Sequence, residues 1–170
     1  MIVAEAIAEW LEKRGITHAF GIIGGGNFVL WDAIVRRGFT EVVCVHHEQT
    51  AAMAPSYFYR TSGVLAAVLC TTGAGSTNAI TGVAAAYMDR VPVLILSGNE
   101  ASRYMLKPTR IWGVQGFDSS GFAREFTKYS DRMYCREHVR LLDNAFDAAM
   151  TAPHGPAWID IPKDIQGEVV

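Results

Sequence analysis

The sequence predicts an α/β fold, a three-layer sandwich in which helices cover both faces of a mainly parallel sheet of about six strands. Short apolar runs alternate with segments whose apolar residues repeat at helical spacing, which is the pattern of β-α-β units. Residues 91–96 are almost wholly apolar, as expected for a strand that is covered on both faces. The length of 170 residues suits one domain with a full hydrophobic core.

In the first half of the chain, each predicted helix ends near a glycine. Helical periodicity covers residues 2–11, 28–37 and 49–60, and the glycines that follow are Gly15, Gly38 and Gly63. Glycine adopts the left-handed conformation that commonly ends helices, so these positions are stop signals. The apolar runs between these helices predict strands over residues 18–22 and 41–45.

The second half of the chain continues the alternation after a strand over residues 64–70. Residues 99–118 lack periodicity and are expected to form a long loop, a kind of segment that is usually functional or part of an interface. The remaining segments are expected to be a helix over 76–89, strands over 91–96 and 124–129, a helix over 137–150 and a strand over 157–162.

Composition and charge narrow the class of protein. Hydrophobic residues make up 50% of the chain and charged residues 19%, which excludes a disordered chain. A net charge of −2 gives no basic field for nucleic acid or for an anionic membrane. The three scattered cysteines, at positions 44, 70 and 135, favour a reducing compartment over disulfides or a metal cluster. We therefore expect a cytoplasmic domain that holds no metal of its own, with no nucleic-acid partner and no membrane span.

Two polar segments follow predicted strands. His46-His47-Glu48-Gln49 comes after the strand over 41–45, and residues 71–78 (Thr-Thr-Gly-Ala-Gly-Ser-Thr-Asn) come after the strand over 64–70. Open α/β sheets bind ligands at the carboxyl ends of their strands, and glycine lets backbone approach a ligand closely. Apolar neighbours disfavour the charged form of the Glu48 carboxyl, which suits proton transfer, although a solvated acid is also common at a helix start.

The known motifs for nucleotides, zinc and nucleophilic catalysis match the sequence only in part or not at all. The segment that begins at Gly73 has Asn78 where a dinucleotide fingerprint needs its third glycine, and the turn at residues 24–26 lacks the fingerprint spacing. A nucleotide-binding Rossmann-like module stays open as an alternative. A zinc motif that starts at His47 would need a second histidine at Ala51, and neither a Walker lysine nor a nucleophile elbow occurs in the sequence.

Five segments together carry a family resemblance. They are Gly21-x-x-Gly24-Gly25, His47-Glu48-Gln49, Thr72-Gly73-x-Gly75-x-Thr77-Asn78, Ala86-Tyr87-Met88-Asp89-x-x-Pro92 and Pro156-x-x-x-Asp160-Ile161-Pro162-x-Asp164. In this order and at these spacings, residues 1–170 resemble the N-terminal aminopyrimidine-binding (Pyr) domain of thiamine-diphosphate enzymes, of the acetolactate synthase type.

The resemblance implies a catalytic role for Glu48. In that family the matching glutamate hydrogen-bonds N1′ of the cofactor's aminopyrimidine and favours the imino tautomer, which activates the cofactor for 2-keto-acid chemistry. The resemblance also implies that Gln115 lines the substrate pocket and that the whole protein is a 2-keto-acid decarboxylase or carboligase. The implied cofactor contacts are Gly24, Gly73, Ala74 and Asn78.

The family binds the diphosphate and Mg²⁺ through a separate C-terminal domain with a Gly-Asp-Gly motif, which this sequence lacks. We therefore expect the chain to hold only the pyrimidine end of thiamine diphosphate and to be inactive alone. A diphosphate-binding domain on a longer chain or on a separate subunit would complete the site. The resemblance also implies that the whole protein is a homo-oligomer. Pro55 should cost about 3 kcal/mol inside a helix or kink it, and Tyr57 replaces a family glycine where subunits pack. A non-catalytic interaction domain is the other alternative.

Overall fold

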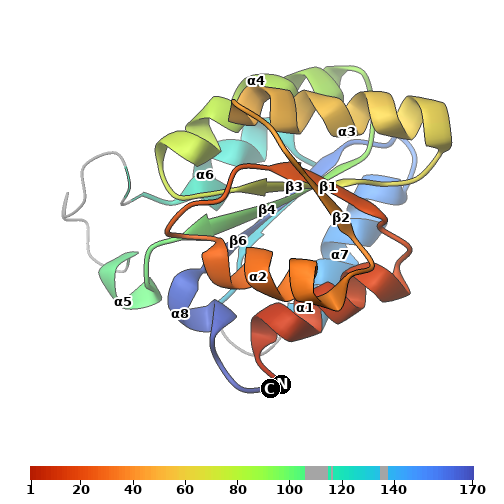
Figure 1. Cartoon of the computed structure of the whole chain (residues 1–170). Helices are drawn as coiled ribbons and strands as arrows, with labels where there is room; N and C mark the ends of the chain where they lie inside the picture. Colours follow the sequence, from red (N-terminus) through yellow and green to blue (C-terminus); the bar gives the residue numbers. More distant parts are fainter. Residues whose placement is uncertain (106–114, 116, 135–137) are drawn as a thin grey trace.

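The structure, a computed structural model, describes residues 1–105, 115, 117–134 and 138–170. Its centre is a six-stranded sheet in the order β2-β1-β3-β4-β6-β5, in which each neighbouring pair runs parallel (Figure 1). The strands are β1 His18–Gly21, β2 Glu41–Cys44, β3 Ala67–Cys70, β4 Val93–Asn99, β5 Tyr129–Arg132 and β6 Pro156–Pro162. The predicted fold class is confirmed.

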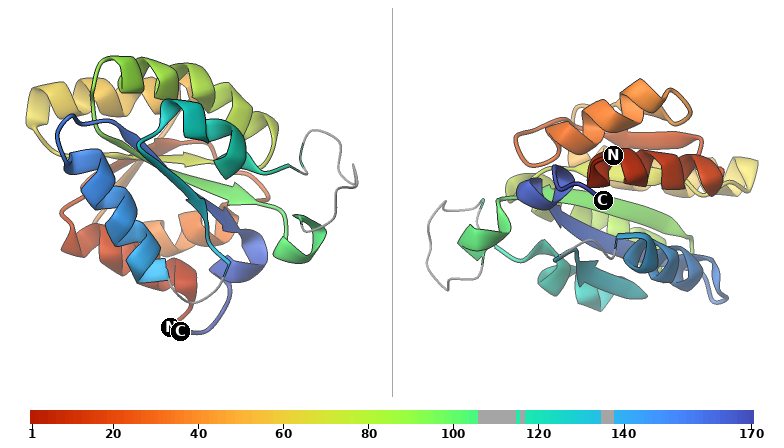
Figure 2. Two further views of the ribbon diagram at one scale, coloured as in Figure 1. Left: turned by 180° about the vertical axis from the view of Figure 1, so that it is seen from behind. Right: turned by 90° about the horizontal axis from the view of Figure 1, so that it is seen from below.

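Helices cover both faces of this sheet, as the two further views of Figure 2 show. One layer consists of α1 Val3–Lys13, α2 Phe28–Arg37, α7 His138–Met150 and α8 Lys163–Gln166. The other consists of α3 Glu48–Ser62, α4 Ala74–Met88 and α6 Ser119–Ala123, and the short helix α5 Ser102–Met105 follows β4. Each layer encloses its own apolar cluster against the sheet, so the chain buries its apolar surface on itself.

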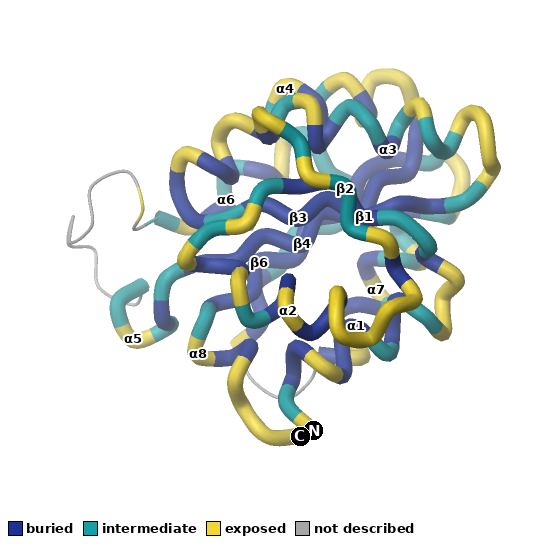
Figure 3. Tube along the Cα trace, in the orientation of Figure 1, coloured by how far each residue is buried: buried dark blue, intermediate teal, exposed yellow. Residues whose placement is uncertain are grey.

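The central strands are buried on both faces. Every residue of β3, β4 and β6 is buried, whereas the edge strand β2 has only half-buried and exposed positions (Figure 3). This burial explains the nearly continuous apolar run that the sequence shows in the fourth strand. Because all the strands run the same way, the segments that follow β1, β2 and β3 meet along one edge of the sheet.

The predicted helix ends are confirmed where glycine marks them. Gly38 and Gly63 both have φ 74°, and their N–H groups bond the carbonyls of Ile34 and Tyr59 at the ends of α2 and α3. A residue with a Cβ is disfavoured in this left-handed conformation, so glycine fixes the last turn. The third helix runs as one element through the buried Pro55.

One predicted strand is misplaced. Residues 124–129 were expected to be extended, but Arg124–Phe126 forms a 3₁₀ helix and β5 begins only at Tyr129. Phe122 and Phe126 pack against the apolar cluster that contains Trp158. Their spacing of four residues is a helical one, and the apolar content of the segment reflects this contact rather than strand pairing.

The two ends of the chain lie side by side (Figure 1). Ile2 and Val169 form an antiparallel bridge, and the N–H of Val3 donates to the carbonyl of Glu168 at 2.8 Å. Among the described residues, no helix combines the length and apolar character that crossing a bilayer requires.

Candidate active site

Glu48 is the first residue of α3 and lies at the carboxyl end of the sheet. His47 precedes it as the helix cap, and its Nδ1 accepts a hydrogen bond from the N–H of Gln49 at 3.1 Å. The Glu48 side chain is 9% exposed, although the histidines before it are exposed. Its place in the first helical turn suits a carboxylate, because the amino end of a helix carries partial positive charge.

Glu48 lies against the first turns of α4. Asn78 Nδ2 donates to Glu48 Oε2 at 3.1 Å. A Cβ placed on Gly75 would lie 3.3 Å from Glu48 Oε1, so glycine at this position leaves the space beside that oxygen free of a side chain. The two polar segments that the sequence singles out therefore meet in space, with the acid from one and the amide from the other in direct contact.

Gly73 turns the chain from β3 into α4. It is buried, caps the helix and has φ 63° and ψ −114°, a conformation that residues with a Cβ rarely adopt. The helix begins at once with Ala74, and Ala74 and Asn78 are both exposed. Four residues apart on a helix, they share one face, so Asn78 presents its amide beside a small side chain.

The turn that contains Gly24 packs against the same region through Thr71. The N–H of Gly26 donates to Thr71 Oγ1 at 3.1 Å. A Cβ on Gly24 would lie 2.6 Å from Thr71 Oγ1, and one on Gly75 would lie 2.9 Å from Thr71 Cγ2. Glycine is therefore required at both positions, because a side chain would collide with the threonine. The structure thus brings Gly24, Gly73, Ala74 and Asn78 to one edge of the sheet with Glu48.

Gln115 is not joined to this group by the structure. Its side chain is exposed, and residues 106–114 and 116 lie outside the described part of the chain. Among the described contacts, none connects Gln115 to Glu48 or to the turn at Gly73.

Asp160, which the sequence singled out only as part of a motif, is bonded to several polar side chains near the carboxyl ends of β4 and β6. It is fully buried and accepts hydrogen bonds from Ser97 and Asn99 at 2.7 Å each, from Ser119, and from Arg132 Nε at 3.2 Å. Burial raises the pKa of Asp160, and the hydrogen bonds and the Arg132 charge oppose that rise. A charged residue inside an otherwise apolar strand was the available signal for such a network.

The two cysteines that the structure describes, Cys44 and Cys70, differ in exposure. Cys70 ends β3 and is buried, and this burial raises the pKa of its thiol, which keeps it neutral. Cys44 ends β2 and is exposed, and Cys135 lies outside the described residues.

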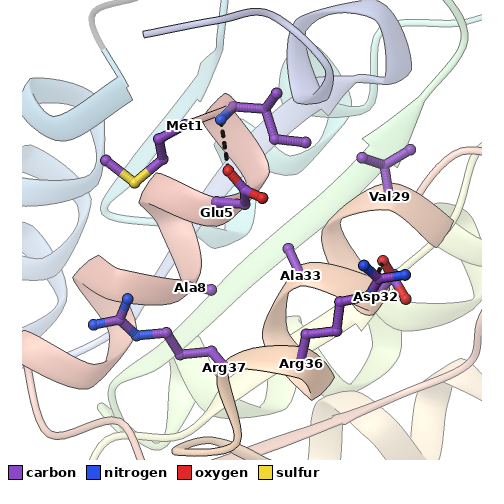
Figure 4. A pocket seen from close by; sticks show the side chains of 9 residues that line it. Met1, Glu5, Ala8, Val29, Asp32, Ala33, Arg36 and Arg37 are labelled. Atoms are coloured by element: carbon purple, nitrogen blue, oxygen red, sulfur yellow. Dashed lines mark hydrogen bonds and ion pairs between the residues drawn. The ribbon is translucent and has the colours of Figure 1, made fainter.

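A hollow of about 360 Å³ between α1 and α2 lies apart from these residues (Figure 4). Both of its arginines are paired with acids, because Arg36 Nε lies 2.9 Å from Asp32 Oδ2 and Arg37 Nε lies 2.6 Å from Oε2 of Glu12, outside the hollow. Its lining residues are Met1, Ile2, Glu5, Ala8, Val29, Asp32, Ala33, Arg36 and Arg37. None of the predicted site residues belongs to it.

Known proteins resemble the chain over nearly its whole length. It is 37% identical over 166 residues to the acetolactate synthase large subunit of Buchnera aphidicola subsp. Schizaphis graminum, and 36% identical over 166 residues to the acetolactate synthase isozyme 3 large subunit of Escherichia coli. It is 36% identical over 171 residues to the probable acetolactate synthase large subunit of Methanocaldococcus jannaschii. These alignments cover 95%, 95% and 98% of this chain but 28% of each relative's length.

The sequence model of one protein family also matches the chain. The family is described as thiamine pyrophosphate enzyme, N-terminal TPP binding domain, and the match covers residues 1–131. This stretch includes Glu48 and both glycine turns. The match favours the predicted resemblance over a Rossmann-like nucleotide module. The chain therefore belongs to the thiamine pyrophosphate enzyme family, as its N-terminal TPP binding domain.

Proposed function

We propose that the chain is the pyrimidine-binding part of a thiamine-diphosphate-dependent 2-keto-acid decarboxylase or carboligase of the acetolactate synthase type. The relatives' names support the enzyme class. The observation that carries the role of Glu48 is its burial at the meeting point of α3 and α4, with one oxygen bound to Asn78 and the other beside Gly75.

The residues at this edge fit the aminopyrimidine end of the cofactor. A flat heterocycle needs a hydrogen-bonding partner for its ring nitrogen and close backbone beside its face. Glu48 supplies the partner through Oε1, which no side chain at Gly75 obstructs. Gly73, Ala74 and the turn at Gly24 supply small residues, and Asn78 supplies a polar contact.

The proposed chemistry divides between cofactor and protein. Thiamine diphosphate, when bound, supplies an electron sink for decarboxylation of a 2-keto acid. Glu48 would hydrogen-bond the ring nitrogen and exchange a proton with it. Its burial strengthens this interaction, because a hydrogen bond is worth more where water is excluded. Asn78 positions the carboxyl by donating to its second oxygen.

The rest of the enzyme would complete the site. The chain spans 28% of the length of the curated relatives, and its sequence has no Gly-Asp-Gly motif for the diphosphate. We place the diphosphate and Mg²⁺ on a further domain of a longer chain or on a separate subunit, in a cytoplasmic homo-oligomer. Gln115 would line the pocket for the keto acid, and the exposed Tyr57 would lie near a subunit contact.

The test is turnover of a 2-keto acid by the full assembly, with this chain and its diphosphate-binding domain both present. Glu48→Gln keeps the size of the side chain but cannot exchange the proton, so we expect turnover to fall by about 100-fold or more. Glu41→Gln, which changes an exposed carboxylate on β2, is the matched control and should leave turnover unaltered.

The spectrum of the bound aminopyrimidine provides a second measurement that does not depend on turnover. The Glu48→Gln assembly should bind thiamine diphosphate yet lack the circular dichroism signal of the imino tautomer. Unchanged turnover together with an unchanged signal would contradict the role of Glu48 and would favour the interaction-domain alternative.

A further inference from the structure

A second hollow, of about 410 Å³, opens at the amino ends of the strands. Three segments form it: the end of α4, the residue before β5 and the turn before β6. Its lining residues are Tyr87, Met88, Arg90, Lys128, Pro153 and His154. Its volume falls within the range of small-molecule sites.

This hollow lies at the opposite edge of the sheet from Glu48. Lys128 directly precedes β5 and His154 lies two residues before β6, whereas Glu48 and Gly73 follow the carboxyl ends of β2 and β3. In a parallel sheet, these two sets of strand ends lie at opposite edges. A ligand here would therefore be separate from the cofactor of the proposed function.

The lining carries positive charge without a compensating acid. Arg90 and Lys128 are cationic, and none of the six lining residues has a carboxylate. The neighbouring Asp89 is engaged elsewhere, because its Oδ2 lies 2.7 Å from Arg60 Nη2 and it lines a separate hollow between α3 and α4. The Tyr87 hydroxyl and the His154 ring add further hydrogen-bonding groups.

Arg90 is held in a conformation that usually belongs to glycine. Its φ is 54°, which makes it the only residue other than glycine with a positive φ among the described residues. The N–H of Val91 donates to the carbonyl of Ala86 at 2.9 Å and the N–H of Arg90 to that of Tyr87 at 3.2 Å. This is a Schellman motif with arginine at the position that glycine normally takes.

The Schellman motif has two consequences for the hollow. It satisfies carbonyls of the last turn of α4, which would otherwise repel an anion. It also means that the chain carries arginine where glycine or asparagine would relieve backbone strain. Backbone strain of this kind clusters at binding sites, which suggests that the arginine is kept at this position for its side chain.

The side chains of Lys128 and His154 are held by contacts within the chain. Lys128 Nζ donates to the carbonyl of Thr151, and its stem crosses Gly155, where an added Cβ would lie 3.0 Å from Lys128 Cγ and Cδ. The His154 ring meets the Tyr59 ring edge-on at 6.0 Å between centroids. Side chains fixed in advance lose little freedom when they bind a ligand.

We propose that this hollow binds the phosphate group of a small phosphorylated molecule. A phosphate offers several acceptor oxygens and more than one negative charge, which match the cations of Arg90 and Lys128 and the neighbouring hydroxyl and imidazole. The hollow is larger than a phosphate ion, so the organic part of a phosphate monoester would occupy the remainder, over Met88 and Pro153.

The test is a titration of the chain of residues 1–170 at constant ionic strength, followed by the NMR shifts of its backbone amides. The probes are inorganic phosphate, glycerol 3-phosphate and glycerol. We expect saturable shifts confined to residues 87–91, 128 and 154–155, with glycerol 3-phosphate binding at least as tightly as inorganic phosphate and glycerol causing none.

Three variants localise the binding. Lys128→Met keeps the stem over Gly155 and removes the charge, and Arg90→Asn keeps a residue that tolerates the left-handed conformation. Each should weaken glycerol 3-phosphate binding by about tenfold or more. Lys13→Met removes an equal charge from α1, where the side chain is 70% exposed, and should not change the affinity. Far-ultraviolet circular dichroism verifies that each variant is folded.

Several results would overturn the proposal. These are shifts that do not saturate, binding of inorganic phosphate with exclusion of glycerol 3-phosphate, and an equal loss of affinity in Lys13→Met, which would indicate only general attraction of anions. Shifts centred on residues 48 and 73–78 would place the anion at the other edge of the sheet and would equally refute it.

Discussion

Gly73 fixes the direction in which α4 leaves the sheet. With φ 63° and ψ −114°, it lets the helix start at the next residue, so that Ala74 and Asn78 face the edge where Glu48 lies. The cap has no side-chain hydrogen bond to help it. The backbone conformation of this one residue therefore determines where the amide of Asn78 meets the carboxylate.

Replacing Gly73 with alanine should lower the free energy of unfolding by about 1–3 kcal/mol, because a Cβ is strained in this conformation. Urea denaturation measures the change. Gly25→Ala is the control, since its Cβ would meet nothing within 4 Å and its φ is not positive, and its effect should stay below about 0.5 kcal/mol. Equal losses in the two variants would show that strain at Gly73 is not the cause.

At the scale of single residues, the sequence predicts which residues belong to the site better than it predicts which of them contact one another. Glu48 and Gly73 could be singled out because each follows an apolar run that ends in a change of period. The bond between Glu48 and Asn78 could not, because 30 residues separate them. The surroundings of Asp160 were also hidden, since its partners come from β4, β5 and α6 and only folding brings them together.

Helices α3 and α4 pack at very short range through Gly82. A Cβ added there would lie 2.6 Å from the Ala52 Cβ and 2.9 Å from the Ala52 carbonyl carbon. Both helices begin at the candidate site, so their spacing also sets the distance between Glu48 and Asn78.

Gly82→Ala should therefore push the two helices apart. We expect overpacking to cost more than the roughly 1 kcal/mol that the better helix propensity of alanine regains, so the net loss should be about 1–2 kcal/mol. Thr81→Ala, at an exposed position of α4, should be close to neutral. Thermal unfolding compares the two, and the same variant should weaken binding of thiamine diphosphate by the full assembly. A Gly82→Ala protein as stable as Thr81→Ala would contradict the close contact.

Asp143 links α7 to α1 by charge as well as by packing. Its Oδ1 accepts from Trp10 Nε1 at 2.8 Å and lies 2.5 Å from Arg14 Nη2. Burial by itself raises the pKa of Asp143, but these hydrogen bonds and the Arg14 charge outweigh it and lower the pKa below its ordinary value. The stabilisation is therefore present above the ordinary carboxyl pKa and is lost as the pH falls through the lowered value.

Asp143→Asn should cost about 0.5–1 kcal/mol near neutral pH, a modest amount because the side chain is 37% exposed. The difference from the parent should shrink as the pH falls through the lowered pKa of Asp143, because the parent then loses the charge as well. Urea denaturation across this pH range measures it. Asp147→Asn, on an exposed position of the same helix, should show no such trend. A difference that stays constant with pH would rule out the charge as its source.

At the scale of elements, periodicity and glycine stops were sufficient for most of the chain. The ends of α2 and α3 follow from Gly38 and Gly63. The prediction of a strand over 124–129 was wrong. Phe126 packs against the apolar cluster that contains Trp158, as Phe122 does one helical turn earlier, and a short apolar run does not distinguish strand from helix.

Across the whole molecule, Gln166 connects the last helix to the first glycine turn. Its Oε1 accepts from the N–H of Leu30 at 3.1 Å, and its Nε2 donates to the carbonyls of Gly26 and Ile161 at 2.6 and 2.8 Å. It is fully buried and supplies the start of α2 with an acceptor that Asn27, the capping residue, does not provide. The C-terminal segment thus supports the turn that contains Gly24.

Gln166→Leu conserves volume but leaves these three backbone groups without a partner, so we expect a loss of about 2–4 kcal/mol. Chemical denaturation gives the total loss, and hydrogen exchange at Gly26 and Leu30 shows whether the loss begins at the turn. The exposed Gln115→Leu is the comparison and should change stability by less than about 0.5 kcal/mol. Undiminished protection at Leu30 would mean that the cap is dispensable.

The arrangement of the sheet was beyond the reach of the sequence pattern. Alternating strands and helices predict parallel pairing, but the order β2-β1-β3-β4-β6-β5 depends on which faces pack, and that is decided jointly by the whole chain. The contact between α8 and the turn at Gly26 spans 140 residues and leaves no local signal.

Asn99 and Ser119 both hydrogen-bond the carboxylate of Asp160, and Asn99 Nδ2 also lies 3.3 Å from Ser119 Oγ. The two ends of the intervening stretch are therefore bonded to the same buried carboxyl group. Closing a longer stretch between fixed ends costs only about 0.6 kcal/mol for each doubling of its length. Insertions and deletions between these two anchors should thus be tolerated in evolution, and this is where homologous proteins can diverge in length while the sheet stays as it is.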